Sequence, residues 1–247
     1  GRSKCMLFSY FDVGTTAKSF QWSVAKNVRA LSVYRTKVAK VIAQHDNKHP
    51  EYSLVHAVDP AVHDVVNSIR KDFSKIKHLV LIGIGGSNLG TEAVHQLLGE
   101  RKVQLHSLDT IAPYQVDELA KNLKRVKKAS QIAVCVISKS GGTTETLVNA
   151  GVILDVLETQ FGKSIYKQVI SIGNPGTVFH KTIKKLGGQT VAMPDIVGGR
   201  YSVGTEVGLI PLALLGHNVD GFIEGLLDSS KEQFESVTAE NAARLYI

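Results

Sequence analysis

The sequence contains few cysteines, few aromatic residues and no long apolar run. Its two cysteines, Cys5 and Cys135, have no metal-ligand spacing, and such sparse use of cysteine is typical of a reducing cytoplasm. Aromatic residues make up 6% of the chain, which disfavours stacking platforms for single-stranded nucleic acid. No apolar run approaches membrane-spanning length, so the sequence predicts a soluble, cytoplasmic protein without a membrane partner.

The two ends also lack the usual marks of a start and a stop. Residues 1–5 contain no initiator methionine and no apolar signal-peptide core, which indicates either an engineered edge or an internal starting point. Residues 239–247 keep a helix-forming composition to the last position, with no glycine or proline to stop the helix. We therefore expect a polypeptide that is cut off within a helix.

What is present is enough apolar sequence for a full core and an excess of basic charge. With 247 residues, 43% of them hydrophobic, we expect one large α/β domain with extensions rather than two equal domains. The net charge of +7 favours small anions or nucleic acid as partners. The densest basic run, residues 121–128, belongs to a segment with an apolar stripe at helical spacing. We interpret the run as a solvated helix face and predict no nucleic-acid partner.

Strands and helices alternate through the middle of the chain. Five short apolar runs predict strands at residues 78–82, 103–108, 132–137, 168–172 and 189–193, and amphipathic segments between them predict helices. Such alternation indicates a parallel sheet covered on both faces. Further helices are predicted at residues 18–44, from Asp59-Pro60, at residues 204–215 with a kink at Pro211, and from Asp220.

The third predicted strand, which we expect at the centre of the sheet, runs into a turn rich in hydroxyl groups. The turn has the sequence Ser138-Lys139-Ser140-Gly141-Gly142-Thr143-Thr144-Glu145-Thr146 and leads into an apolar helix. The hydroxyls, the glycines and the unpaired amides that begin the helix suit a terminal phosphate group. A hydroxyl-rich helix cap without a ligand is the alternative. We interpret Glu145 as a cap and loop brace rather than a base.

Two more loops are expected at the same edge of the sheet. Residues 83–88 follow the first strand, and residues 197–202, which include Arg200, follow the fifth. Ligands of parallel sheets bind beyond the carboxyl ends of the strands, so these loops can face one pocket. Gly83 and Gly85 also begin a dinucleotide fingerprint, but position 88 is Asn, which leaves a dehydrogenase as a minor alternative. His45 and His49 have no third ligand beside them, so we predict no metal site.

Three motifs together resemble the glucose-6-phosphate isomerase family. They are residues 83–90 (Gly-Ile-Gly-Gly-Ser-Asn-Leu-Gly), residues 138–146, and residues 198–202 (Gly-Gly-Arg-Tyr-Ser). The resemblance implies a three-layer αβα, flavodoxin-like sugar isomerase (SIS) domain with a five-stranded parallel sheet at residues 76–216. An N-terminal helical segment at residues 1–75 and a C-terminal helical extension at residues 217–247 would flank it. It also implies the glycolytic and gluconeogenic interconversion of glucose 6-phosphate and fructose 6-phosphate, no cofactor, and a homodimer with composite sites.

The same resemblance implies a role for each matching residue. The phosphate and the sugar would be bound by Gly86, Ser87, Ser138, Lys139, Ser140 and Thr143, with Lys139 contributing a backbone donor. Arg200 would be the catalytic residue that stabilises the enediolate. The family's glutamate that moves the proton, with its glutamine, histidine and lysine, lies in a second domain downstream, and Glu206 does not match it. We therefore predict a fragment that binds phosphosugar weakly without isomerising it, with a stand-alone regulatory phosphosugar-binding module as the alternative.

Overall fold

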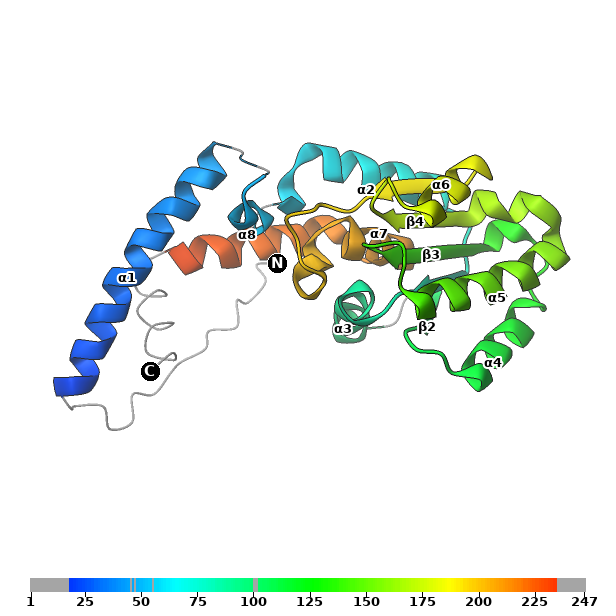
Figure 1. Cartoon of the computed structure of the whole chain (residues 1–247), viewed down its shortest axis with the longest axis horizontal. Helices are drawn as coiled ribbons and strands as arrows, with labels where there is room; N and C mark the ends of the chain where they lie inside the picture. Colours follow the sequence, from blue (N-terminus) through cyan, green and yellow to red (C-terminus); the bar gives the residue numbers. More distant parts are fainter. Residues whose placement is uncertain (1–17, 45, 47, 55, 100–101, 235–247) are drawn as a thin grey trace. The chain divides into compact units, whose positions relative to one another are not determined.

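The computed structural model describes residues 18–234, except residues 45, 47, 55, 100 and 101 (Figure 1). The chain divides into two compact units, one formed by residues 1–44 and 228–247 and the other by residues 45–227. In the first unit, α1 (Lys18–Ala43) is an unbroken helix that agrees with the predicted one. Cys5, His45 and the predicted helical end at residues 239–247 lie outside the described residues.

The second unit is built on a five-stranded, fully parallel sheet. Its strands are β1 (His78–Ile82), β2 (Gln104–Leu108), β3 (Ile132–Ser138), β4 (Val169–Gly173) and β5 (Gln189–Ala192). They lie in the order β2-β1-β3-β4-β5, with Val80 opposite Val134 and Val136 opposite Ser171. Every residue of β3 is buried, as its continuous apolar sequence predicts for a central strand covered on both faces. The predicted parallel α/β sheet is therefore confirmed.

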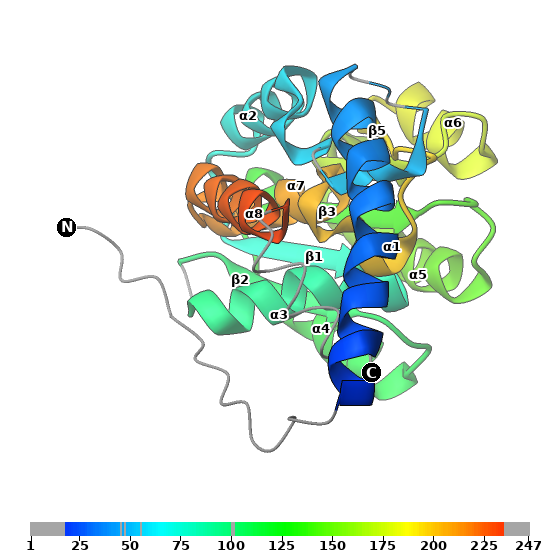
Figure 2. The ribbon, with the colours of Figure 1, turned by 90° about the vertical axis from the view of Figure 1, so that its left-hand side faces the viewer.

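Helices cover both faces of this sheet and complete a three-layer fold. They are α2 (Pro60–Asp72), α3 (Leu89–Leu98), α4 (Pro113–Leu123), α5 (Thr144–Phe161), α6 (Val178–Lys185) and α7 (Glu206–Leu215), followed by α8 (Val219–Phe234). Helices α2 and α7 lie over one face of the sheet and α4 and α5 over the other (Figure 2). One apolar core joins α2 and α7 to the sheet, and a second joins α4 and α5 to the opposite face. The division at residues 75/76 and 216/217 into three domains stays a prediction.

Local sequence signals set several helix boundaries correctly. Asp59 precedes α2 and accepts a hydrogen bond from the amide of Ala61 at 2.9 Å, with Pro60 as the first helical residue. Pro211 lies inside α7, as predicted. The predicted start of this helix, residue 204, is instead the last residue of a 3-10 turn, η6 (Gly199–Gly204), and α7 begins at Glu206. Among the described residues, no helix has both the length and the apolar character needed to cross a membrane.

A half-buried histidine pair on the first two strands makes the stability of the fold depend on pH. Nε2 of His106 lies 3.2 Å from Nδ1 of His78, and burial, with a smaller contribution from His78, lowers the pKa of His106 from 6.5 to about 4. Because the folded state binds this proton less readily than the unfolded chain, the stabilisation is complete above pH 6.5 and is lost as the pH falls towards 4. The shift corresponds to about 3 kcal/mol, which partial solvent exposure reduces to about 1–2 kcal/mol.

We therefore expect the free energy of unfolding in urea to decrease between pH 7.5 and pH 5, and His106→Gln to remove about 1 kcal/mol of that decrease. Asn122→Gln, an exposed polar change on α4 that neither adds nor removes a titrating group, is the control and is expected to leave the decrease unchanged. An unaltered pH dependence in His106→Gln would contradict this assignment.

Candidate functional site

Three loops leave the carboxyl ends of strands β1, β3 and β5. We call them the first loop (residues 83–88), the hydroxyl loop (residues 138–143) and the arginine loop (residues 194–204). Strands β1 and β3 are neighbours in the sheet, and the strand order reverses between them. The crevice at such a reversal is where open α/β sheets bind ligands, so the first loop and the hydroxyl loop occupy the expected place.

The hydroxyl loop gathers short polar side chains in front of α5. Ser138 ends β3 and is 7% exposed, and its Oγ accepts a hydrogen bond from the Gly141 amide at 3.1 Å and lies 3.4 Å from Oγ1 of Thr143. Ser140 is exposed and accepts from the Gly142 amide at 3.2 Å. Thr143 precedes α5 without a side-chain cap, so the first amides of this 18-residue helix keep no side-chain partner at that position. The loop thus combines hydroxyls, open amides and a helix dipole, which together suit an anion.

Backbone packing brings the first loop against the arginine loop. A Cβ on Gly86 would lie 2.6 Å from the Arg200 nitrogen and closer still to the Gly199 carbonyl group. Ser202 is fully buried, and its Oγ is 3.0 Å from the carbonyl oxygen of Gly86 and 2.6 Å from that of Gly199. The predicted sugar-contacting loop and the predicted catalytic arginine are therefore neighbours, and the Arg200 side chain is exposed at this edge.

Lys139 connects the hydroxyl loop to the arginine loop through its side chain. Its Nζ donates hydrogen bonds to the carbonyl oxygens of Asp195 at 2.8 Å and Val197 at 3.1 Å. The sequence predicts only a backbone donor for Lys139, and a bond from its side chain to distant carbonyl groups leaves no signal in the sequence. Together with the contact between Gly86 and Arg200, this bond joins all three loops.

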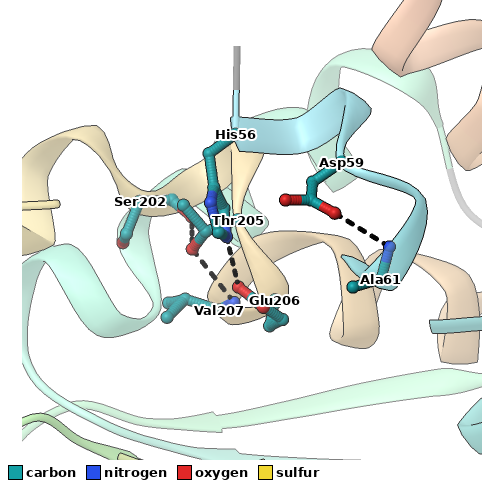
Figure 3. Close-up of polar contacts among 7 residues, drawn as sticks. All are labelled: His56, Asp59, Ala61, Ser202, Thr205, Glu206 and Val207. Atoms are coloured by element: carbon teal, nitrogen blue, oxygen red, sulfur yellow. Dashed lines mark hydrogen bonds and ion pairs between the residues drawn. The ribbon is translucent and has the colours of Figure 1, made fainter. Parts of the chain in front are cut away.

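The base of the arginine loop is fixed by a cap and an ion pair, shown in Figure 3. Thr205 donates from Oγ1 to the carbonyl oxygen of Ser202 at 2.7 Å and accepts from the Val207 amide at 3.3 Å, which caps α7. Glu206 is 9% exposed, and its carboxylate pairs with Nε2 of His56 at 3.1 Å. The Glu206 carboxylate therefore points to His56, and the expectation that Glu206 is not the base stays a prediction.

Of the two histidines named as possible metal ligands, the structure describes His49. Nδ1 of His49 contacts the carboxylate of Glu51. Within the part of the chain that the structure describes, no group of three or more histidine, cysteine, aspartate or glutamate side chains has a metal-binding arrangement. Cys135 is buried on β3, and burial raises the pKa of its thiol, so it is not a reactive nucleophile.

The chain has relatives among known proteins. The sequence profile of the family described as phosphoglucose isomerase matches residues 21–246. The chain belongs to the phosphoglucose isomerase family. A curated relative in it, glucose-6-phosphate isomerase of Clostridium novyi (strain NT), is 32% identical over 192 residues, which cover 72% of this chain and 43% of that protein. The chain thus spans less than half the length of this relative.

Solved structures show the same fold as this member of the phosphoglucose isomerase family. A hypothetical protein from Thermus thermophilus matches with a TM-score of 0.76 and 25% identity, over 92% of this chain and 54% of that one. A glucose-6-phosphate isomerase from Chlamydia trachomatis matches with a TM-score of 0.62 and 22% identity, over 77% of this chain and 36% of that one. The family resemblance seen in the three motifs is confirmed, whereas the roles of the individual site residues stay predictions.

Proposed function

We propose that the chain forms the phosphate-binding and part of the sugar-binding side of a site that interconverts glucose 6-phosphate and fructose 6-phosphate. The proposal rests on the three loops that meet beyond the carboxyl ends of the strands. Lys139 and Ser202 join these loops into one surface. On that surface, the hydroxyls of Ser138 and Thr143 lie beside the first amides of α5. A phosphate dianion accepts several hydrogen bonds and matches this set of donors.

The isomerisation moves a proton between two adjacent carbons while negative charge develops on the sugar oxygens. Arg200 follows the backbone that touches Gly86, so a sugar contacting Gly86 and Ser87 is within reach of a fixed positive charge. Proton transfer also requires a positioned base, which the family resemblance places in the downstream domain. Glu206, whose carboxylate contacts His56, does not match the glutamate that the family resemblance implies for that role. We therefore expect the chain alone to bind the substrate weakly and to leave it unconverted, with catalysis belonging to a longer, homodimeric protein.

The direct test of this proposal is a titration of the chain with fructose 6-phosphate, sorbitol 6-phosphate and sulfate, followed by NMR or thermal shift. Replacing both Ser138 and Thr143 by alanine is expected to weaken sugar-phosphate binding by at least about tenfold, because two donors to a charged group are lost. Ser164→Ala removes an exposed hydroxyl that bonds the Phe161 carbonyl and serves as the control.

Equal binding by the double variant and the unchanged chain would place the phosphate elsewhere and refute the proposal. A coupled assay on the same samples measures turnover. Conversion of fructose 6-phosphate by this chain at the rate of a complete enzyme would show that the missing base is not required.

A further inference from the structure

Asn88, the last residue of the first loop, is a fully buried polar residue. It directly follows Ser87 and precedes the first residue of α3. Asparagine in this position usually caps the helix with its side-chain oxygen, but no side chain caps α3. The side chain is directed to other partners, which is unusual for a residue at the start of a helix.

Three side chains from three different elements form a closed triangle at this point. Nδ2 of Asn88 donates to Oε1 of Glu92 on α3 at 3.0 Å and to Oγ of Ser107 on β2 at 3.2 Å. The Ser107 hydroxyl donates its proton to the same Glu92 oxygen. The three bonds are satisfied together when the amide nitrogen of Asn88 faces both partners and Oε1 of Glu92 is the acceptor. The triangle therefore fixes one orientation of the Asn88 side chain.

The triangle lowers the stability of the fold relative to an apolar side chain at position 88. Oδ1 of Asn88 is buried and has no hydrogen-bond partner among the described residues. An unpaired buried oxygen lowers stability, and an apolar side chain of similar size would avoid that loss. A polar network that reduces stability is better explained by the position that it imposes on its neighbours.

Those neighbours are the parts of the first loop that face the ligand site. Ser87 is bonded to Asn88 through the backbone, and the Gly83 amide donates to the Leu108 carbonyl oxygen at 3.2 Å, so both ends of the first loop are tied to the end of β2. Gly86, between these two points, lies against Arg200. A shift of Asn88 would therefore move Ser87 and Gly86 relative to the hydroxyl loop.

We propose that the triangle of Asn88, Glu92 and Ser107 is a positioning element that sets where the first loop meets the sugar. The inference rests on the proposed function, because only a ligand that spans the hydroxyl loop and the first loop can sense the distance between them. Inorganic phosphate needs the hydroxyl loop alone and is the matched probe. The triangle thus controls the affinity for the sugar part of the ligand and leaves the affinity for phosphate unchanged.

The test first replaces the Asn88 amide by a carboxylate and then exchanges the amide and the carboxylate between positions 88 and 92. Asn88→Asp places a second carboxylate against Glu92, and we expect the dissociation constant for fructose 6-phosphate to rise about tenfold while that for inorganic phosphate changes less than about twofold. The double variant Asn88→Asp/Glu92→Gln restores one donor and one acceptor and is expected to recover most of the affinity. Asn122→Asp makes the same chemical change at an exposed position on α4 and is the control.

A second readout needs no ligand. In the NMR spectrum of the free chain, Asn88→Asp is expected to shift the amide resonances of Gly86 and Ser87, with little effect on Gly141 and Gly142, and the double variant is expected to reverse the shift. Absence of sugar-phosphate binding in the unchanged chain would refute the proposed function while this spectrum still tests the triangle.

Two outcomes overturn the inference. One is an Asn88→Asp chain that binds both ligands as the unchanged chain does, and the other is an equal loss for sugar phosphate and phosphate, which indicates general destabilisation. Should Asn88→Asp fail to fold, Ser107→Ala decides, because it removes two of the three hydrogen bonds of the triangle without adding charge. A Ser107→Ala chain that loses affinity for fructose 6-phosphate but not for inorganic phosphate supports the inference. Equal effects on the two affinities, or no effect on either, refute it.

Discussion

Gly86→Ala is expected to abolish sugar-phosphate binding and to destabilise the fold by about 3 kcal/mol, because the new methyl group would overlap backbone atoms. The Cβ position at Gly86 is 2.6 Å from the Arg200 nitrogen and also collides with the Gly199 carbonyl group. Backbone cannot rotate away as a flexible side chain can, so the first loop and the arginine loop must separate. That separation would also stretch the hydrogen bond from Ser202 to the Gly86 carbonyl oxygen.

The measurement is a urea unfolding curve together with a titration with fructose 6-phosphate. Gly151→Ala is the matched control, since a Cβ at Gly151 on α5 meets no atom within 4 Å. Alanine in a helix is favoured over glycine, so this control is expected to be neutral or to stabilise by up to about 1 kcal/mol. A Gly86→Ala chain with unchanged stability and affinity would show that the two loops do not touch as described.

The sequence predicts the sheet and most of its helices, because local patterns of residues determine them. The apolar residues of β3 have no polar face to expose, so a central, doubly covered strand is the arrangement that buries them all. Asp59 and Pro60 similarly determine the start of α2 through local chemistry. Boundaries are less accurate where local signals compete. Helix α4, one of the helices predicted between the strands, begins at Pro113, because proline is favoured in the first turn.

The contacts between loops could not be predicted, because most of their acceptors are carbonyl oxygens. Ser202 reaches Gly86, 116 residues away, and Lys139 reaches Asp195, 56 residues away. Every residue carries such an oxygen, so the sequence does not indicate which one accepts. Asn88 illustrates the same limit, since the sequence reveals only that it replaces a glycine of the dinucleotide fingerprint. Ser107 becomes its partner only because β2 pairs with β1 in the folded sheet, and the sequence does not show this pairing.

Gly141 of the hydroxyl loop has a packing role that the sequence does not reveal, because it makes room for a neighbouring side chain. The role of the glycines in bringing the backbone close to a ligand stays a prediction. Gly141 has a φ of +63°, and a Cβ there would lie 2.7 Å from Oγ1 of Thr177 and nearer to the carbon atoms of that side chain. Thr177 in turn caps α6 through the His180 amide. The hydroxyl loop is therefore shaped by its packing against the start of α6.

This packing predicts that two adjacent glycines respond very differently to alanine. Gly141→Ala combines the left-handed backbone with a collision, so we expect a loss of about 3 kcal/mol in stability and loss of binding to both fructose 6-phosphate and inorganic phosphate. Gly142→Ala is the control, because its Cβ would meet only Oγ of Ser140, at 4.0 Å, and we expect stability within about 1 kcal/mol of the unchanged chain. Urea unfolding and phosphate titration by NMR measure both effects. Similar behaviour of the two variants would contradict the described loop, since the prediction depends on Gly141 alone facing Thr177.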